Sequence, residues 1–403
     1  MPDTLPLSEL ITLIITTSPT PSAPSTELVE ATLAAFRAHC PALLSRGCRV
    51  VVVLDTYDRV GASARLKKGQ VTPEGAALAE AYRRNVRALV LREYGYGCGD
   101  GELELELELE RGGLAEYGSP CVETNAVAYA TRRTPDRRVT FIEPERRLGF
   151  GLAVREALRA AATPYVWVQQ HDWPLVDRVP LRGIVGVMGA SEEDEDGDRG
   201  DAPPVRYVCL PSVRMLAYAA SAHVLRFPAL RRLTAALKRE FVVPSPAPTT
   251  TTTTTVTPEM AATAGVVSEG KEEEGASVIP LTPLFFWHDK PHVASRAHYL
   301  ARVFPSRLAM PRGAFIEDTI GQRAREQMKE GNWAKWACWL YYPDDGRSVC
   351  LRHLNGRKWR GAEAEMHKKA LWMEAQIIPG EGGGGEGGGG DGGGDGGGVE
   401  KED

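Results

Sequence analysis

Residues 148–173 of this 403-residue chain read LGFGLAVREALRAAATPYVWVQQHDW, and this stretch decides the predicted fold. A glycine turn opens a short helix, an apolar run of β-branched and aromatic residues at 165–168 predicts a strand, and Asp172 follows that strand. In open α/β sheets, ligands bind outside the carboxyl ends of the strands. A carboxylate at this position could hold a metal-bound diphosphate, so the stretch indicates chemistry on a nucleotide-linked substrate.

Strands and helices alternate on the N-terminal side of this stretch. Residues 49–54 (RVVVVL) are nearly continuous in valine, as expected for a strand that is buried on both faces. The predicted elements, in chain order, are a strand at 11–16, a helix at 24–39, a strand at 49–54, a helix at 73–92, a strand at 139–142, a helix at 151–161 and a strand at 165–168. This alternation predicts an α/β fold with a doubly wound, mainly parallel central sheet and helices on both faces.

The C-terminal half is less regular. Candidate strands lie at 206–210 and 292–295, and Glu317 and Asp318 precede a helix predicted to reach about residue 329. Residues 336–342 and 348–353 flank Asp344-Asp345-Gly346, a strong turn signal, and therefore predict a C-terminal hairpin. One domain over residues 8–375 fits this pattern better than two independent domains.

Biased tracts interrupt the predicted domain at 101–113, 190–203 and 244–276, and a glycine-rich acidic tail covers 380–403. These tracts have few apolar side chains to bury and predict disordered insertions. The alternating Glu and Leu residues of 102–110 are compatible with an exposed edge ribbon or, preferably, with decoration of a loop. Because the tracts hold many of the acids, the rest of the chain is basic, which suits an anionic ligand.

Several classes of protein are disfavoured. The seven cysteines form no CxxC pair, which indicates reduced thiols and not a disulfide framework. The apolar run at 10–15 is too short for a signal peptide or a membrane helix, so we expect no integral membrane segment and a cytoplasmic location by default. No basic-aromatic motif of a nucleic-acid module occurs, and we expect no nucleic-acid partner.

The order of these motifs resembles the GT-A fold glycosyltransferases, most closely the inverting family 2 group. The motifs that carry the resemblance are the Thr16-Thr17-Ser18-Pro19 loop after the first strand, Asp55 after the second, the helix that begins Gly151-Leu-Ala-Val-Arg155, the segment Gln170-His171-Asp172 at the D-x-D position, the pair Glu317-Asp318, and His353. The first acid of the D-x-D motif is absent, because Gln170 stands there. The resemblance implies a single Rossmann-like domain that binds a nucleotide-diphospho-sugar.

The resemblance also implies roles for individual residues. Asp318 would be the catalytic base, with Glu317 orienting it or holding the acceptor. A Mn²⁺ or Mg²⁺ cofactor would be held by Asp172 with His353 or His171, while the diphosphate supplies further oxygens. Residues expected to bind the nucleotide-sugar are Thr16, Ser18, Pro19, Asp55, Arg155, Gln170 and Trp173. The acceptor is an unidentified glycan, protein or small molecule.

Structural roles remain open for the same residues. Asp172 could cap a strand, His171 could stack in the cleft, His353 could be a hydrogen-bonded strand residue, and Arg155 could be ion-paired on its helix. Two other functions also remain: a non-catalytic nucleotide-sugar- or carbohydrate-binding relative, favoured by the missing first acid, and a nucleotidyltransferase. The latter would normally carry a glycine-rich basic loop after the first strand, where this chain has Ser18-Pro19-Thr20-Pro21.

Overall fold

The computed structural model describes residues 5–45, 47–61, 69–97, 107–118, 125–196, 203–243, 277–306 and 309–377. The chain divides into two compact units, residues 1–360 and 361–403. The first unit contains the sheet and every predicted site residue. The second contributes helix α10 (Ala362–Ile377), so the predicted domain of 8–375 extends beyond the first unit. The predicted insertion at 244–276 and the tail at 380–403 lie outside the described residues.

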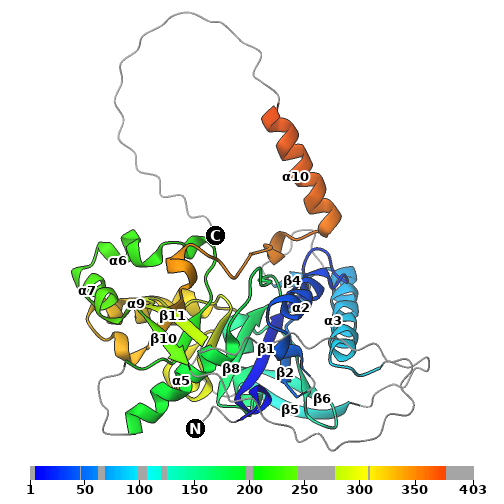
Figure 1. Cartoon of the computed structure of the whole chain (residues 1–403). Helices are drawn as coiled ribbons and strands as arrows, with labels where there is room; N and C mark the ends of the chain where they lie inside the picture. Colours follow the sequence, from blue (N-terminus) through cyan, green and yellow to red (C-terminus); the bar gives the residue numbers. More distant parts are fainter. Residues whose placement is uncertain are drawn as a thin grey trace, which may run out of the picture. The chain divides into compact units, whose positions relative to one another are not determined.

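An eleven-stranded sheet forms the centre of the first unit, in the order β10-β11-β13-β9-β12-β8-β1-β2-β7-β6-β5 (Figure 1). Its strands are β1 (Ile11–Thr17), β2 (Arg49–Leu54), β5 (Glu108–Glu116), β6 (Ala126–Arg133), β7 (Val139–Pro144), β8 (Tyr165–Gln170), β9 (Tyr207–Cys209), β10 (Arg239–Val243), β11 (Ser277–Pro283), β12 (His292–Ser295) and β13 (Cys338–Tyr341). The short strands β3 (Arg59–Val60) and β4 (Gln70–Val71) form a separate parallel ribbon.

The α/β class is confirmed, but the prediction of a mainly parallel sheet is wrong. Strands β7, β2, β1 and β8 are parallel neighbours, as the alternation predicted. Beyond β8 the direction reverses, because β12 is antiparallel to both β8 and β9. The pairs β5–β6, β6–β7, β10–β11 and β11–β13 are antiparallel too, so the sheet is mixed. Short strands such as β12 carry little periodicity from which a direction could be predicted.

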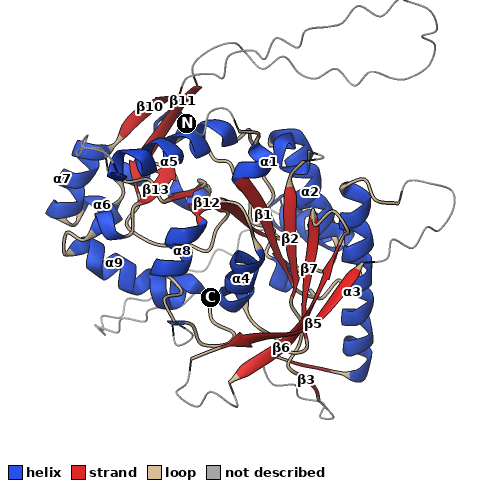
Figure 2. Ribbon diagram, turned by 90° about the horizontal axis from the view of Figure 1, so that it is seen from below, coloured by secondary structure: helices blue, strands red, loops and turns tan. Residues whose placement is uncertain are grey.

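Helices lie on both faces of the parallel strands. The chain passes from β1 to β2 to β7 in one direction and then returns from β7 to β8 across the sheet. Right-handed crossovers therefore place α4 on the face opposite α2 and α3, and Figure 2 shows α3 and α4 on opposite sides of these strands. The described helices of this unit are α1 (Leu7–Leu10), α2 (Glu27–His39), α3 (Pro73–Glu93), α4 (Phe150–Ala160), α5 (Leu181–Asp196), α6 (Ala222–Leu225), α7 (Pro228–Leu237), α8 (Arg296–Arg302) and α9 (Gln322–Lys329).

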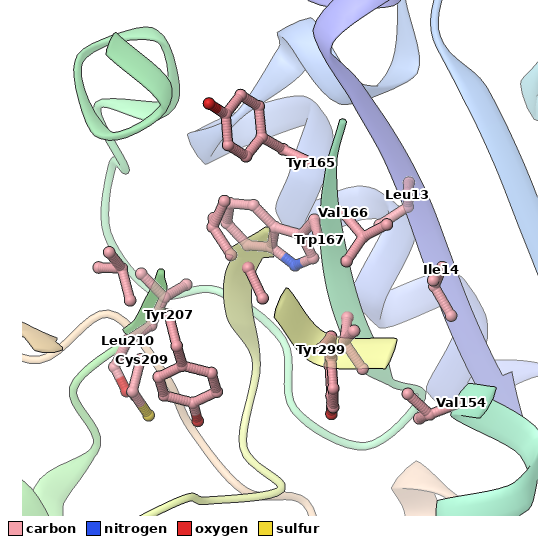
Figure 3. Close-up of a cluster of buried hydrophobic side chains, with 14 of the residues drawn as sticks. Leu13, Ile14, Val154, Tyr165, Val166, Trp167, Tyr207, Cys209, Leu210 and Tyr299 are labelled. Atoms are coloured by element: carbon pink, nitrogen blue, oxygen red, sulfur yellow. The ribbon is translucent and has the colours of Figure 1, made fainter. Parts of the chain in front are cut away.

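The core follows from the strand sequences. The valines of β2 are buried, as a strand covered on both faces requires. Figure 3 shows Trp167 of β8 in a buried cluster with Leu13 and Ile14 of the neighbouring β1 and with Tyr207 and Tyr299. Trp167 also meets Phe36 of α2 edge to face, with ring centroids 5.6 Å apart. This packing fixes β1 and β8 side by side, and their carboxyl ends then share one edge of the sheet.

The predicted C-terminal hairpin is wrong. Asp344, Asp345 and Gly346 do turn the chain, with left-handed φ angles of 48°, 53° and 78°. However, β13 pairs with β11 on one side and β9 on the other, so neither edge is open to the returning chain. Residues 348–353, the crossing segment, instead pass the segments that follow β8 and β9, where Leu351 forms isolated bridges with Leu175 and Ser212.

Two predicted insertions are partly ordered. Glu108–Glu116 forms β5, the strand at one edge of the sheet, so the loop expected over 101–113 is wrong from residue 108 onward. Residues 190–196, predicted as part of a second insertion, continue α5. Residues 101–106 and 197–202 lie outside the described part of the chain. No helix among the described residues is both long and apolar enough to cross a bilayer.

Candidate functional site

A cavity of about 510 Å³ lies at the carboxyl ends of β1, β2 and β8. Strand order reverses between β1 and β8, because the chain runs from β1 toward β7 on one side and returns to β8 on the other. Such switch points are where open α/β sheets bind ligands. The volume lies within the usual range for small-molecule sites, about 300–1,000 Å³.

Many of the predicted site residues line this cavity. They are Thr16, Ser18, Pro19, Asp55, Gln170, His171 and Asp172. Five others, Arg155, Trp173, Glu317, Asp318 and His353, are not among the lining residues. Two of these, Trp173 and His353, nevertheless contribute to the environment of Asp172, as described next.

Asp172 is a buried carboxylate that the chain holds from two sides. It is 8% exposed, and its Oδ2 accepts hydrogen bonds from Nε2 of His353 at 3.1 Å and from the backbone N–H of Gly356 at 2.9 Å. Burial alone would raise the pKa of Asp172. The hydrogen bond from His353, the charges of His171 and His353 and the Gly356 N–H outweigh burial and lower this pKa to about 2. Asp172 is therefore ionised throughout the physiological pH range.

The two histidines reach Asp172 in different ways. His171 follows β8, its Nδ1 lies 3.3 Å from the carbonyl oxygen of Thr16, and its buried Nε2 has no hydrogen-bond partner among the described residues. His353 comes from the C-terminal crossing segment and stacks on Trp173, with ring centroids 4.3 Å apart and an interplanar angle of 11°. This stacking orients the imidazole of His353 toward Asp172.

Gly356 packs directly against Asp172 and His171. A Cβ at this position would lie 2.9 Å from Oδ2 of Asp172 and 3.0 Å from Nε2 of His171. The residue must therefore lack a side chain for the crossing segment to approach both polar groups. Sequence reasoning missed Gly356, although the Asn355-Gly356 pair that follows His353 is a recognisable turn signal.

Asp55 has a structural role in this structure. Its Oδ1 accepts the N–H of Leu148 at 2.8 Å, and its Oδ2 accepts the N–H of Gly149 at 2.9 Å. The carboxylate thus fixes the glycine turn that begins α4. Gly149 has a φ of 81° and would place a Cβ 2.4 Å from the backbone of Gly313, so both the conformation and the close approach require glycine.

Two cations that sequence reasoning did not select also line the cavity. Arg147 immediately precedes the LGFG turn, and Arg357 follows Gly356. The guanidinium of Arg357 lies over the ring of Phe315, 4.9 Å from its centroid. Two aspartates and two arginines therefore line the cavity, and Asp55 is engaged by backbone N–H groups. Asp172 together with the two guanidinium groups is the charge pattern expected for a phosphate-bearing ligand and an associated cation.

Gln170 links the end of β8 to the segment that carries Glu317 and Asp318. Its Nε2 donates to the carbonyl oxygen of Asp289 at 2.9 Å. The N–H of Asp289 in turn donates to Oε2 of Glu317 at 3.2 Å, and the N–H of Glu317 donates to Oδ2 of Asp289 at 3.3 Å. The neutral amide of Gln170 is therefore a structural contact, and replacing it with an acid would remove the donor.

Burial governs the titration of the groups beside Glu317. Burial, together with the charge of Glu317, holds the pKa of Asp289 well above its ordinary value, and its Oδ1 has no partner among the described residues. Burial lowers the pKa of His288 to about 4, so this imidazole is neutral near pH 7 and its 3.6 Å contact with Glu317 is not an ion pair there. Asp318, one residue further on, is exposed.

Arg155 lies apart from the cavity. It is fully buried in α4, its Nε donates to Oε1 of Glu156 at 2.9 Å, and Nη2 donates to the carbonyl oxygen of Glu116. Arg155 is therefore an ion-paired helix residue, one of the two roles left open for it. Its guanidinium faces β5 and not the cavity.

Among the described residues, no group of three or more His, Cys, Asp or Glu side chains is arranged to hold a metal ion. The predicted ligands do lie close together, since Asp172 contacts His353 directly and both Asp172 and His171 face Gly356. Comparison of the sequence with protein-family models and with curated proteins finds no match.

Proposed function

We propose that this protein is a glycosyltransferase that moves a sugar from a nucleotide-diphosphate donor to an acceptor hydroxyl by inverting displacement. The observation that supports the proposal most is the position of Asp172. It is an ionised carboxylate at the switch point, in a cavity of suitable volume that also contains Arg147 and Arg357. The strand arrangement β7-β2-β1-β8 supports a Rossmann-like, GT-A-type nucleotide-binding half.

The donor would occupy the cavity with its nucleoside between the Thr16–Pro19 loop and the end of β2. Loop residues Ser18 and Pro19 and the end of β2 line this part, together with Leu78 of α3. The diphosphate would then lie between Asp172 on one side and the guanidinium groups of Arg147 and Arg357. These cations would stabilise the charge that develops on the departing diphosphate.

The acceptor would approach from the side of Glu317 and Asp318. As its oxygen bonds to the anomeric carbon, the bond from that carbon to the diphosphate breaks, and the acceptor proton passes to a carboxylate. We assign this base to Asp318, because its side chain is exposed and it lies three residues after Phe315, which lines the cavity. Glu317 is held by the backbone of Asp289 and would position Asp318.

The chemistry of the residues around Asp172 also fits a divalent cation. Asp172 is ionised, and the buried Nε2 of His171 beside it lacks a partner among the described residues. We therefore propose that Asp172 and one histidine, His171 or His353, are the protein ligands of Mn²⁺ or Mg²⁺, and that oxygens of the diphosphate supply the others. Such an ion would neutralise part of the leaving group's negative charge.

Donor binding can be tested with a thermal-shift screen of nucleotide-sugars, each with and without Mn²⁺. A donor at about 100 times its Kd would stabilise the native protein by roughly 2.7 kcal/mol. Asp172→Asn should abolish the shift, whereas Asp177→Asn, an exposed aspartate on the same connection, is the matched control and should keep it. A screen with no shift for any donor would contradict the proposal.

Turnover then tests the reaction itself. With a stabilising donor, we expect Mn²⁺-dependent release of the nucleoside diphosphate, and Asp318→Asn should reduce the rate by about 10²–10⁴-fold while the thermal shift persists. A second candidate function is a non-catalytic nucleotide-sugar-binding relative, favoured by Gln170 at the position of the missing acid. Donor binding without release of nucleoside diphosphate, with and without added acceptors, would select that candidate.

A further inference from the structure

Residues 212–239 form a continuous basic segment, and none of these residues lines the cavity. The sequence SVRMLAYAASAHVLRFPALRRLTAALKR contains six Lys and Arg residues and no Asp or Glu. It folds into the helical turns Val213–Met215 and Tyr218–Ala220, followed by α6 and α7. Helices α6 and α7 lie next to each other in both Figure 1 and Figure 2.

This segment exposes aliphatic side chains as well as charge. Val213 is 68% exposed, Leu225 49% and Leu216 41%. Their neighbours Met215, Tyr218, Val224 and Leu230 are buried. The segment is therefore anchored to the core by one set of apolar residues and presents a second set to the exterior. Along this one segment, exposed aliphatic side chains alternate with exposed arginines, and the turn at Tyr218–Ala220, α6 and α7 pack against one another in succession. An interaction surface combines exposed apolar side chains with a polar surround in this way.

Four arginines of the segment, Arg214, Arg226, Arg231 and Arg232, are exposed. None of them has a carboxylate within ion-pair distance in the described part of the chain. Lys238 differs, because it pairs with Asp345. We define the basic surface as these four arginines together with Val213, Leu216 and Leu225.

The beginning of the basic segment contacts the crossing segment that carries His353. Ser212 bridges Leu351, two residues before His353, and the N–H of Ala217 donates to the carbonyl oxygen of Gly346 at 2.9 Å. Val213 and Arg214 are the next two residues after Ser212, and Ser212 pairs with the crossing segment that carries His353 to Asp172.

We propose that the basic surface docks onto an anionic lipid bilayer. Arginines attract the anionic headgroups, and the exposed aliphatic side chains provide apolar area that can enter the interfacial region. A soluble acidic polymer would match the arginines but would leave Val213, Leu216 and Leu225 in water. This inference does not depend on the proposed sugar transfer, and donor binding measured without lipid tests the two separately.

The test is co-sedimentation of the full chain with phosphatidylcholine vesicles that contain either no or about one-third phosphatidylserine. Each basic residue near an anionic surface changes membrane partitioning by roughly fivefold. Arg231→Glu with Arg232→Glu should therefore lower partitioning into the anionic vesicles by at least about 25-fold. Val213→Ser with Leu225→Ser should lower it by about tenfold or more, because apolar insertion is lost.

The matched charge control is Arg49→Glu with Arg84→Glu, two exposed arginines outside the basic surface. This variant changes net charge equally and should retain most of the binding. The inference is overturned if wild-type protein does not bind anionic vesicles, or if the control loses as much binding as Arg231→Glu with Arg232→Glu. It is also overturned if polyglutamate binds the protein while vesicles do not. Unchanged thermal unfolding of each variant shows that the loss of binding is not a loss of folding.

Discussion

Gly356 shows how one residue without a side chain shapes the centre of the site. Its N–H donates to Asp172, and its Cα lies where any Cβ would contact both Asp172 and His171. The crossing segment that carries His353 can therefore approach the end of β8 only with glycine at this position. The position of the Asp172 carboxylate therefore depends on the Gly356 contact as well as on β8.

Gly356→Ala should disturb the site more than the fold. We expect a loss of about 1–3 kcal/mol in the free energy of unfolding from overpacking, and loss of the donor-dependent thermal shift. Gly331→Ala is the control: Gly331 has a φ of 91° and open space at Cβ, so only backbone strain, about 1–2 kcal/mol, is introduced. Chemical denaturation and thermal shift measure both variants. A normal donor shift in Gly356→Ala would contradict this account.

Gln170 provides a second test at the residue scale. Gln170→Glu restores an acid at the D-x-D position but removes the amide donor to Asp289 and adds a negative charge near Glu317. We expect the variant to lose about 1–3 kcal/mol of stability in urea denaturation and to gain no donor binding. Gln170→Ala loses the same hydrogen bond without adding charge and should lose less. Stronger Mn²⁺-dependent donor binding by Gln170→Glu would show that the amide contact is dispensable.

Among the elements, α4 depends on a residue far from it in sequence. Asp55, at the end of β2, accepts both N–H groups of the turn that precedes the helix, Leu148 and Gly149. Asp55 also accepts the N–H of Thr56, so Asp55→Ala leaves three buried donors unpaired and should lower the free energy of unfolding by about 2–4 kcal/mol or more in urea denaturation. Asp177→Ala, at an exposed position, should change it by less than about 0.5 kcal/mol. Equal effects of the two variants would refute this role for Asp55.

The elements that the sequence predicted correctly are those with strong local signals. The valine run of β2, the apolar run of β8 and the helix after the LGFG turn all occur near their predicted positions. The hairpin failed because its pairing depends on which edges of β13 are free, and β9 and β11 occupy both. The predicted direction of β12 is wrong for a similar reason, because the strands with which it pairs are distant in sequence.

At the scale of the whole molecule, the sequence predicted which strand ends would meet but not what fills the space between them. Asp55, Asp172 and the loop after β1 line one cavity, as parallel neighbours require. Arg147 and Arg357 were missed because nothing in their immediate sequence marks them as cavity residues. Gly356 was missed because its turn signal does not show which residues the turn contacts. Arg155 was selected from a motif, yet its helix turns it toward β5.

Stability of the whole molecule should fall in mild acid. Burial lowers the pKa of His292 to about 3, while an unfolded histidine titrates near 6.5. Between these values only the unfolded chain binds the proton, so stability is full above about pH 6.5 and falls toward pH 3. The slope is up to about 1.4 kcal/mol per pH unit for this one group. The buried imidazoles of His288 and His298, whose pKa values burial lowers to about 4, act in the same direction.

Urea denaturation at several pH values between 7 and 4.5 measures this slope. His292→Phe keeps a ring beside Tyr207 but removes the titrating group, so its free energy of unfolding should depend less steeply on pH. His223→Phe, at an exposed position, should leave the slope unchanged. A slope in His292→Phe equal to that of the wild type would assign the acid sensitivity to other groups.

The reversed direction of β12 has a consequence for how such chains are searched for functional residues. In the parallel strands, the residues that follow each strand lie at the end of the sheet where the cavity is. His292, the first residue of β12, lies opposite Val168 near the end of β8, so β12 delivers the residues that come before it. Asp289 meets Gln170 by this route. In this mixed sheet, residues that precede an antiparallel strand therefore meet, at one rim, residues that follow a parallel one.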